Sequence, residues 1–404
     1  MIRPAIQRYL AGLSRNTVLL ALASLFADVS TEMLYPVLPV FLTQTLNASG
    51  SIVGLVDGFA QATQNIVQGF SGTLSDKSQN RKAIAFAGFV VAAIAKPLMG
   101  LSTMWQGVFG ARLLDRFGTG VRSAPRDALV ASSVEEKDRG KAFGLEGLGD
   151  NTGAFLGPLV AAFLLYAVQV GLRTVFYLAV IPGLVAALMI LLVKERAVSV
   201  AAKSKVDAGP RQWPRDYWSY VAVIAVFGLG NSSSAFLILR MQDIGSSLPM
   251  TILVYASFNL VAAMISYPAG SLSDALGRRN VLFASFLIFA TAYLGFAVSQ
   301  DVPFATMLFV LYGLHQGIFR AVGKALASDL VPEHLRASGL GWYSATIGSL
   351  QLVANIAAGV LWDRIGHQAV FYYGAAFAIM GSIALIVLLP ARHSSTRAGN
   401  GQAN

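Results

Sequence analysis

The chain has 404 residues, of which 55% are hydrophobic and 12% are charged, and its formal net charge is +10. This charged share is about half of the ~25% that is typical of soluble domains, so the composition excludes an ordinary soluble protein. The chain contains no cysteine, which excludes disulfides and thiolate metal sites.

Twelve apolar segments are long enough for membrane-spanning helices, which need about 18–20 residues. In chain order they cover about residues 17–43, 50–75, 82–101, 104–132, 141–166, 173–193, 217–240, 247–272, 280–299, 303–330, 338–361 and 369–390. They lack the period-2 alternation of barrel strands, and backbone groups in lipid must be paired internally. The predicted fold is therefore all-α, a polytopic membrane protein with twelve transmembrane helices.

Basic residues gather in alternate connections, which argues against a nucleic-acid surface and predicts the orientation. Such groups occur at 77–82, 137–141, 194–215 and 278–279. The positive-inside bias places these connections in the cytoplasm. Because twelve is even, both termini are then cytoplasmic, and the expected location is the cytoplasmic (inner) membrane. Residues 1–16 are expected to form a cytoplasmic amphipathic lead on the membrane surface.

The first span carries two acids, Asp28 and Glu32, which lie one helical turn apart. Both are about half to two-thirds of the way across the membrane. An ionisable side chain at that depth is costly unless it is paired or protonated. Two interpretations follow: the acids form a salt bridge that only holds the bundle together, or they bind a proton or a substrate.

The fourth span is unusually rich in charge, with Arg112, Asp115 and Arg116 on one helical stripe. A soluble core helix with a solvated face is the alternative, and the composition of the whole chain argues against it. In a membrane, these charges must face partners or a wet cavity. Either they form structural bridges with one another, or the arginines meet Asp28 or Glu32 across the cavity.

In the fifth span, Glu146, Asp150, Gly153 and Gly157 share one helical face. Small residues spaced by four permit close contact between helices. The pattern therefore predicts a half-stripe of acids that continues into a closely packed glycine seam.

A short motif shows that the chain contains an internal duplication. Gly72-Thr-Leu-Ser-Asp76 follows the second span, and Gly270-Ser-Leu-Ser-Asp274 follows the eighth, 198 positions later. The same offset relates Arg81 to Arg279, Arg122 to Arg320 and Arg126 to Lys324. We therefore expect two parallel halves. The predicted parts are an N-terminal six-helix bundle at 17–193, a cytoplasmic linker at 194–216, a C-terminal six-helix bundle at 217–390 and a cytoplasmic tail at 391–404.

This motif, placed after spans 2 and 8 of a duplicated twelve-span chain, resembles the major facilitator superfamily. In that family the loop ties neighbouring helix ends together on the cytoplasmic side. The resemblance therefore implies a cytoplasmic gate made of Gly72, Asp76, Arg81, Gly270, Asp274, Arg278 and Arg279. The first copy departs from the family pattern, with Gln79 and Asn80 where glycine and arginine are usual.

Two further motifs carry the resemblance. Arg112 matches the arginine that the family places in span 4, although Asp115 and Arg116 replace the usual polar-uncharged residue and glycine. The run from Gly153 to Pro158 resembles the span-5 motif of exporters that work as proton antiporters. Ala161 and Ala162 stand where that motif ends in glycines.

The mid-depth polar residues of the second half are almost all uncharged, which suits an uncharged or amphiphilic solute. Transporters of this build bind substrate near the midplane, between the repeats. The alternative is simple hydrogen bonding between helices. His315 has no neighbouring His or Cys that predicts a metal site. The candidate substrate cavity is Tyr35, Asn231, Ser234, Asn259, His315, Gln316, Gln351 and Asn355.

The sequence as a whole favours a secondary active transporter that moves a small solute by alternating access, as a proton-coupled exporter. One alternative is a proton-coupled importer of a small organic solute or metal chelate. Another is a non-transporting membrane sensor or scaffold, against which the buried acids argue. The candidate proton-coupling residues around the central cavity are Asp28, Glu32, Arg112, Asp115, Arg116, Glu146 and Asp150.

The expected partners follow from this interpretation. They are a small-molecule substrate, protons and the lipid bilayer, and the protein is expected to be a monomer. Gly-rich phosphate loops, paired nucleophile and base motifs and nucleic-acid signatures do not occur in the sequence. We therefore expect no enzymatic activity, no cofactor and no nucleic-acid partner.

Overall fold

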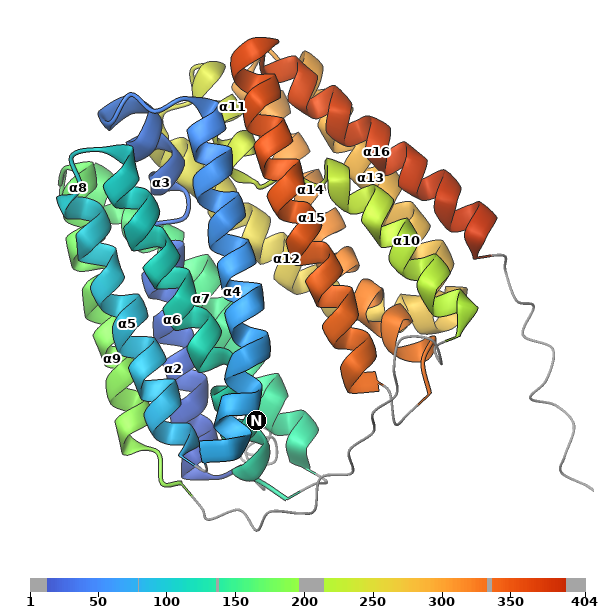
Figure 1. Cartoon of the computed structure of the whole chain (residues 1–404). Coiled ribbons are helices and arrows are strands. Elements are labelled where there is room, and N and C mark those ends of the chain that lie inside the picture. Colours follow the sequence, from blue (N-terminus) through green and yellow to red (C-terminus); the bar gives the residue numbers. More distant parts are fainter. Residues whose placement is uncertain (1–12, 79, 136–137, 196–213, 333–335, 390–404) are drawn as a thin grey trace, which may run out of the picture.

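The structure is a computed structural model that describes residues 13–78, 80–135, 138–195, 214–332 and 336–389. Most of the predicted lead 1–16, most of the linker 194–216 and the tail 391–404 lie outside the described residues. The described part is all-helical and consists of two helical bundles side by side (Figure 1).

The N-terminal half begins with α2 and ends with α9. Its elements are α2 (Arg15–Glu32), α3 (Val37–Val40), η1 (Phe41–Thr45), α4 (Gly50–Ser78), α5 (Arg81–Leu101), α6 (Trp105–Ser132), α7 (Arg139–Tyr166), α8 (Leu172–Leu178) and α9 (Val180–Leu192). The C-terminal half contains α10 (Arg215–Gly230), α11 (Ala235–Asp243), α12 (Leu248–Leu276), α13 (Arg278–Val298), α14 (Val302–Asp329), α15 (Arg336–Arg364) and α16 (His367–Leu388).

These elements form six spans in each half of the described chain, because three spans are interrupted helices. The first joins α2, α3 and η1, the sixth joins α8 and α9, and the seventh joins α10 and α11. Ten spans are long and apolar enough to cross a membrane by composition alone. The other two, α4 and α6, have 29 and 28 residues but contain the charged and polar residues of the interior. The predicted twelve-helix, two-half fold is confirmed.

The first span of each half is interrupted at the interface between the halves. In the N-terminal half the break lies between α2 and α3, where Pro36 precedes the short helix α3. In the C-terminal half it covers 231–234, between α10 and α11. The Tyr35 hydroxyl lies 3.0 Å from the Ser233 hydroxyl and accepts a hydrogen bond from Ser234 at 3.3 Å. The two breaks therefore meet, and their polar groups satisfy one another.

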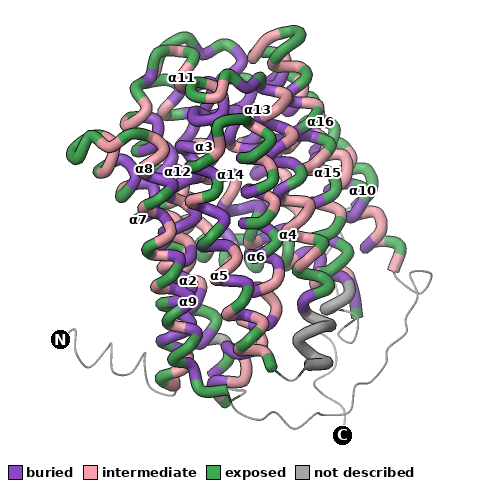
Figure 2. Tube along the Cα trace, turned by 60° about the vertical axis from the view of Figure 1, so that its left-hand side comes forward, coloured by how far each residue is buried: buried purple, intermediate pink, exposed green. Residues whose placement is uncertain are grey.

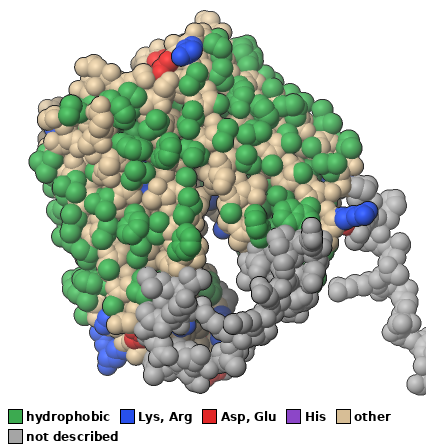
Figure 3. Space-filling model, in the orientation of Figure 1, with side chains coloured by type: hydrophobic (Ala, Val, Ile, Leu, Met, Phe, Trp, Pro, Cys, Tyr) green, Lys and Arg blue, Asp and Glu red, His purple; other side chains and the backbone are tan. Residues whose placement is uncertain are grey.

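The exposed surface of the bundle is apolar and the polar residues are mostly inside, as lipid requires. Figure 2 shows buried residues along the inner sides of the helices, and Figure 3 shows the hydrophobic side chains that cover the outside. Examples of exposed apolar residues are Tyr267, Phe163 and Ile181. The core of the C-terminal half is aromatic, with Phe227, Phe289 and neighbouring rings fully buried.

The two halves touch at one end of the bundle and separate at the other. We call the end where α2 and α10 begin the linker end, and the opposite end the distal end. Figure 3 shows a cleft between the halves that opens toward the linker end. At the distal end, the Asp363 carboxylate of α15 accepts hydrogen bonds from the backbone N–H groups of Gly50 and Ser51, both at 2.8 Å. This carboxylate thus caps the start of α4 across the interface between the halves.

The cap predicts how the distal end is kept closed. Asp363→Ala should shift the halves toward separation at this end, because two N–H groups of α4 lose their acceptor from the other half. The chain contains no cysteine, so the substitutions Thr45→Cys and Ile365→Cys provide two unique sites for nitroxide labels. Pulsed electron paramagnetic resonance then measures the distance between the two labels. We expect the distance distribution to move to longer values.

Asp243 supplies the matched control for this measurement. It lies 3.8 Å from His367, and both residues belong to the C-terminal half, so Asp243→Ala removes an acid near the distal end without removing a contact between the halves. A distribution that Asp363→Ala leaves unchanged would contradict the role of this cap.

Candidate functional site

A buried network of charges lies at the centre of the N-terminal half. Asp115 of α6 has no exposed surface and contacts three cations: Arg112 at 3.0 Å, Lys96 of α5 at 3.2 Å and Arg116 at 3.3 Å. Arg112 also approaches Asp57 of α4 at 3.7 Å. In a low-dielectric interior such groups are stable only when paired, so this network fixes α4, α5 and α6 to one another.

The network continues toward the interface between the halves. The Arg116 guanidinium donates a hydrogen bond to Gln64 of α4 at 3.1 Å. Arg116, Arg320 and Arg112 are the cations within Coulombic reach of the Glu32 carboxylate. Since Arg320 belongs to α14, Glu32 of α2 stands between charges of both halves.

Two tyrosines close the site on its distal side. The Tyr255 hydroxyl of α12 donates a hydrogen bond to Glu32 at 2.9 Å. Its ring stacks on that of Tyr35, with 5.3 Å between centroids and 13° between planes. The Arg112 guanidinium lies 6.0 Å from the centroid of the Tyr35 ring. An acid, a stacked aromatic pair and an arginine thus meet where the two halves touch.

A second group of acids lies nearer the linker end, around Arg126 of α6. Arg126 contacts Glu146 at 2.7 Å and Asp150 at 3.7 Å, both on α7, and its own neighbour Asp127 at 3.1 Å. Ser24 of α2 joins them, accepting from Arg126 at 3.0 Å and donating to Glu146 at 3.1 Å. These contacts tie together α2, α6 and α7.

Asp28 lies between the two groups and differs from the other acids. It is half-buried and within Coulombic reach of Asp150, Arg122, Glu32 and Arg126. Within the described part of the chain, however, Asp28 forms no ion pair and no hydrogen bond. Arg122, for its part, lies 4.3 Å above the Phe89 ring. Asp28 is therefore a carboxyl that can take up a proton without breaking an ion pair.

The glycines of α7 place the acids of α2 where they are. A Cβ atom on Gly153 would lie 2.8 Å from the Asp28 Cβ, and one on Gly157 would lie 2.9 Å from the Glu32 Cβ. Both contacts are too short for any residue other than glycine. The glycine seam thus packs directly against the face of α2 that carries Asp28 and Glu32.

The C-terminal half faces these acids with cations. Arg320 and Lys324 of α14 are exposed and lie one turn apart, and Lys324 is within Coulombic reach of Asp127. They are the duplicates of Arg122 and Arg126. At the same offset of 198 positions, however, Glu146 and Asp150 correspond to Ser344 and Gly348. The second half thus has the corresponding cations but lacks counterparts of the two acids that pair with Arg126 in the first half.

The predicted substrate-cavity residues do not all lie together. Tyr35, Ser234, Asn259 and Asn355 lie at the contact between the halves: Asn259 donates to the Ala154 carbonyl of α7 at 3.1 Å, and Asn355 packs against Gly54 and Gly58 of α4. His315 lies elsewhere. It is fully buried inside the C-terminal half, where Nδ1 contacts Ser285 at 3.0 Å and aromatic rings surround it.

The remaining three predicted cavity residues are Asn231, Gln316 and Gln351, and all are half-buried. Asn231 ends α10, where its backbone N–H donates to the Gly228 carbonyl. A metal centre finds no support: in the described residues, no group of three or more His, Asp or Glu side chains is placed to hold an ion.

The following contacts of the predicted gate residues, among the described residues, each lie within one half. Arg278 pairs with Asp274 at 3.2 Å and with Asp329 of α14, and Arg279 donates to the Leu385 and Ile386 carbonyls of α16. The backbone N–H of Arg81 donates to Glu195 at 2.8 Å. The side chains of Gly72 and Asp76 lie outside the described part, and Gly270 has open space around it.

The site also contains residues that were not among the predicted site residues: Ser24, Asp57, Gln64, Lys96, Arg122, Arg126, Asp127, Tyr255, Arg320 and Lys324. Tyr255 is the hardest of these to predict from the sequence, because an aromatic residue in an apolar span most often faces lipid or belongs to the core. The duplication does supply a signal, since Tyr255 stands 198 positions after Asp57, a residue that also lies beside Tyr35.

Comparison with known proteins agrees with this architecture. The family model described as Major Facilitator Superfamily matches residues 20–237 and 218–404. The chain is 33% identical over 382 residues to an uncharacterised MFS-type transporter of Methanocaldococcus jannaschii, covering 93% of this chain and 95% of the relative. A multidrug resistance protein of Klebsiella pneumoniae is 27% identical over 334 residues, which are 79% of this chain and 77% of that protein.

A solved structure shows the same fold. The nucleoside transporter NupG superposes with a TM-score of 0.80 at 14% identity, covering 93% of this chain and 100% of that structure. Twelve spans in two halves, the repeated loop motif, the family model and the archaeal relative all lead to one conclusion: the chain belongs to the major facilitator superfamily.

Proposed function

We propose that this protein is a proton-coupled exporter of a small solute, with the linker end in the cytoplasm. The basic connections support this orientation, because they lie at the linker end and the positive-inside bias assigns them to the cytoplasm. In this orientation the cleft of Figure 3 faces the cytoplasm. The structure then represents the state in which a solute enters from inside the cell.

The observation that carries the proposal is the state of Asp28. The other acids of the site have cations or hydrogen-bond donors within 4 Å: Asp115 has three cations, Glu146 has Arg126 and Glu32 has the Tyr255 hydroxyl. Asp28 is half-buried beside them without such a partner in the described residues. A buried acid of this kind is most simply used to carry a proton across the membrane.

Exchange of a solute for a proton can be described as a cycle in which Asp28 is open to one side of the membrane at a time. In the state shown, Asp28 releases its proton to the cytoplasm, and a solute enters the cleft. Separation at the distal end then exposes the same cavity to the outside, where the solute leaves and a proton binds. Because the solute and the proton occupy the site in alternation, the inward proton gradient drives the solute out.

Two features support export and a solute with a flat apolar part. The glycine seam of α7 resembles the motif of exporting proton antiporters, and one relative is named as a multidrug resistance protein. The stacked rings of Tyr35 and Tyr255 offer an aromatic surface at the contact between the halves. Uncharged amides such as Asn259 add hydrogen-bonding groups without a net charge.

One observation favours an importer as a second candidate. Arg320 and Lys324 are exposed, and among the described residues neither forms an ion pair with an acid of its own half. An anionic solute would bind these cations best once a proton had neutralised the acids opposite them. Solute and proton would then move together and inward, as in the uptake of a small organic anion.

The decisive experiment uses inverted membrane vesicles energised by respiration, with an acridine dye that reports the internal proton concentration. A panel of planar amphiphilic compounds, beginning with quinolones, and a panel of small organic anions are added in turn. We expect at least one amphiphile to release protons from wild-type vesicles, and Asp28→Asn to abolish this release while the protein still inserts.

Asp138→Asn is the matched control, because Asp138 pairs with Lys141 of its own helix end and lies outside the site. It should behave as wild type. Proton release only from vesicles preloaded with an organic anion would establish the importer instead, because solute and proton then leave the vesicle together. Full coupling in Asp28→Asn would refute the assignment of the proton to this residue.

A further inference from the structure

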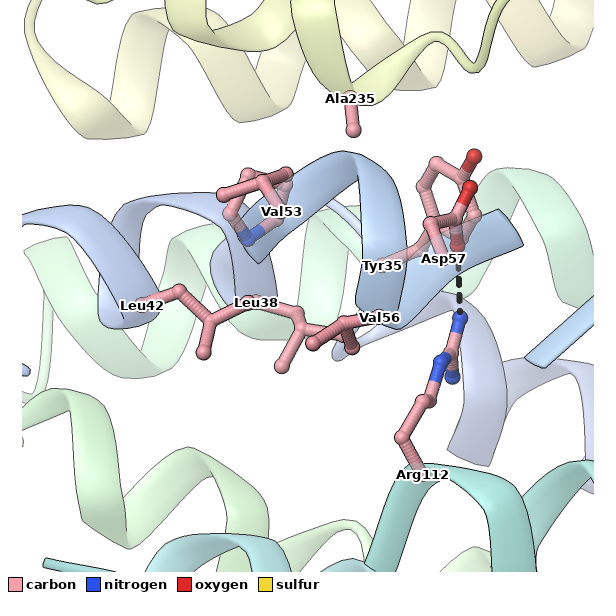
Figure 4. A pocket seen from close by; sticks show the side chains of 9 residues that line it. Tyr35, Leu38, Leu42, Val53, Val56, Asp57, Arg112 and Ala235 are labelled. Atoms are coloured by element: carbon pink, nitrogen blue, oxygen red, sulfur yellow. Dashed lines mark ion pairs between the residues drawn. The ribbon is translucent and has the colours of Figure 1, made fainter. Parts of the chain in front are cut away.

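A small, partly enclosed pocket lies on the distal side of the tyrosine pair (Figure 4). It has room for about one water molecule, and most of its walls are apolar side chains of α3 and α4 and their neighbours. The polar groups that line it are Tyr35, Asp57 and Arg112, and Figure 4 shows the Asp57–Arg112 ion pair at one side.

The polar groups of this cavity are incompletely satisfied. Asp57 is only 5% exposed, and its Oδ2 atom is buried without a hydrogen-bond partner in the described residues. Its Oδ1 atom reaches Arg112 at 3.7 Å, which is longer than the 3.0 Å between Arg112 and Asp115. Arg112 therefore keeps a partner if Asp57 is neutralised. Protonation of Oδ2 would replace this unpaired acceptor with an O–H group and remove the charge of the carboxylate.

The surroundings of Asp57 contain few other titratable groups. From the break between α2 and α3 come Tyr35 and, beyond it, Glu32, and from α6 comes Arg116. Lys96 of α5 is bound to Asp115 on the far side of Arg112. The parts of α11 and α15 that contact α4 beside Asp57 contribute uncharged side chains, namely Phe236, Leu352 and Asn355.

The position of the cavity determines from which side it can be reached. Of its lining residues, Ala235 alone belongs to the C-terminal half. Asp57 lies seven residues from the start of α4, about 10 Å along the helix. The start of α4 is the point that Asp363 caps across the interface. Separation of the halves at the distal end would remove the Ala235 wall and open the cavity outward.

We propose that Asp57 is a second proton-binding carboxyl, which is loaded from the distal side. This inference rests on the proton coupling proposed above. In the distal-open state, an O–H bond forms at Oδ2 as one breaks in a hydronium ion, and water is left behind. On closure the proton passes to the Glu32 carboxylate, which restores the Asp57 carboxylate beside Arg112. The proton-binding carboxyls then lie in the order Asp57, Glu32 and Asp28 from the distal side to the linker side.

The test measures from which side of the membrane a change in pH acts on each acid. The protein is reconstituted in one orientation in vesicles, with nitroxides at Thr45→Cys and Ile365→Cys, and the pH is varied on one side at a time. In the otherwise unchanged protein, acidification of either side should alter the distance distribution. Asp57→Asn should move the midpoint of the distal-side response by at least about one pH unit, a tenfold change in proton concentration, and should keep the linker-side response.

Two further variants make the outcome specific. Asp57→Glu restores a carboxyl and should recover the distal-side response, which separates proton binding from a packing role. Asp28→Asn should lose the linker-side response instead. An unchanged distal-side midpoint in Asp57→Asn would overturn the inference and leave proton coupling intact. Absence of any pH response in the unsubstituted protein would overturn the proposed coupling itself.

Discussion

Asp115→Asn is expected to destabilise the folded protein by about 3–5 kcal/mol, the usual cost of breaking a buried ion pair from one side. Asp115 has no exposed surface and accepts from Lys96 and Arg112. Asparagine fills the same space but, among the described residues, leaves Lys96 and Arg116 without an ion pair and Arg112 with only the more distant carboxylate of Asp57. Thermal unfolding in detergent, followed by circular dichroism, measures the loss.

Asp138→Asn provides the comparison for this prediction, because its pair with Lys141 is largely exposed on the lysine side. We expect it to change the free energy of unfolding by less than about 1 kcal/mol. Adding Lys96→Met to Asp115→Asn removes one unpaired cation and should recover part of the stability. Equal melting temperatures for Asp115→Asn and Asp138→Asn would show that the network does not hold the N-terminal half together.

Gly157→Val is expected to separate α7 from α2, at a cost of about 1–3 kcal/mol for overpacking. The first added carbon would lie 2.8 Å from the Val29 carbonyl oxygen and 2.9 Å from the Glu32 Cβ. Backbone cannot move aside as a flexible side chain does, so the helices themselves must shift. Glu32 would then lose its hydrogen bond from Tyr255, and the distal pH response should weaken with the melting temperature.

Gly147→Val tests whether this effect belongs to the seam rather than to valine in a helix. Gly147 lies on the same helix, and a Cβ atom there has open space around it. This variant should melt close to the wild-type temperature and keep its pH response. If Gly147→Val and Gly157→Val lose stability equally, the close contact with α2 is not the cause.

The twelve spans and the duplication could be predicted from the sequence, because span length, apolar composition and a repeated loop motif are local properties. The pair of Arg112 and Asp115 was also accessible, since residues three apart share a helical face. From the sequence, Arg112 could equally have faced Asp28 or Glu32 across the cavity. It approaches Asp57 instead because of the way α4 packs on α6.

Other parts of the site depend on tertiary packing in the same way. His315 has the depth and chemistry of a cavity residue, yet the rotation of α14 turns it into the aromatic core of its own half. Asp363 lies at the end of a span, where an acid is usually solvated, and its role requires the start of α4 to be adjacent. Tyr255 and Lys96 are likewise defined by partners on other helices.

The loss of acids from the second half has an effect on the whole molecule. One wall of the cleft carries Asp28, Asp127 and Asp150, and the other carries Arg320 and Lys324, so the walls attract each other across the opening. This attraction therefore favours closure of the open cleft, and a proton on any one of the three acids weakens it. Dissolved ions weaken the same force over a distance of about 8 Å at physiological ionic strength. The resting shape of this protein should thus depend on the ionic strength of its surroundings as well as on their acidity.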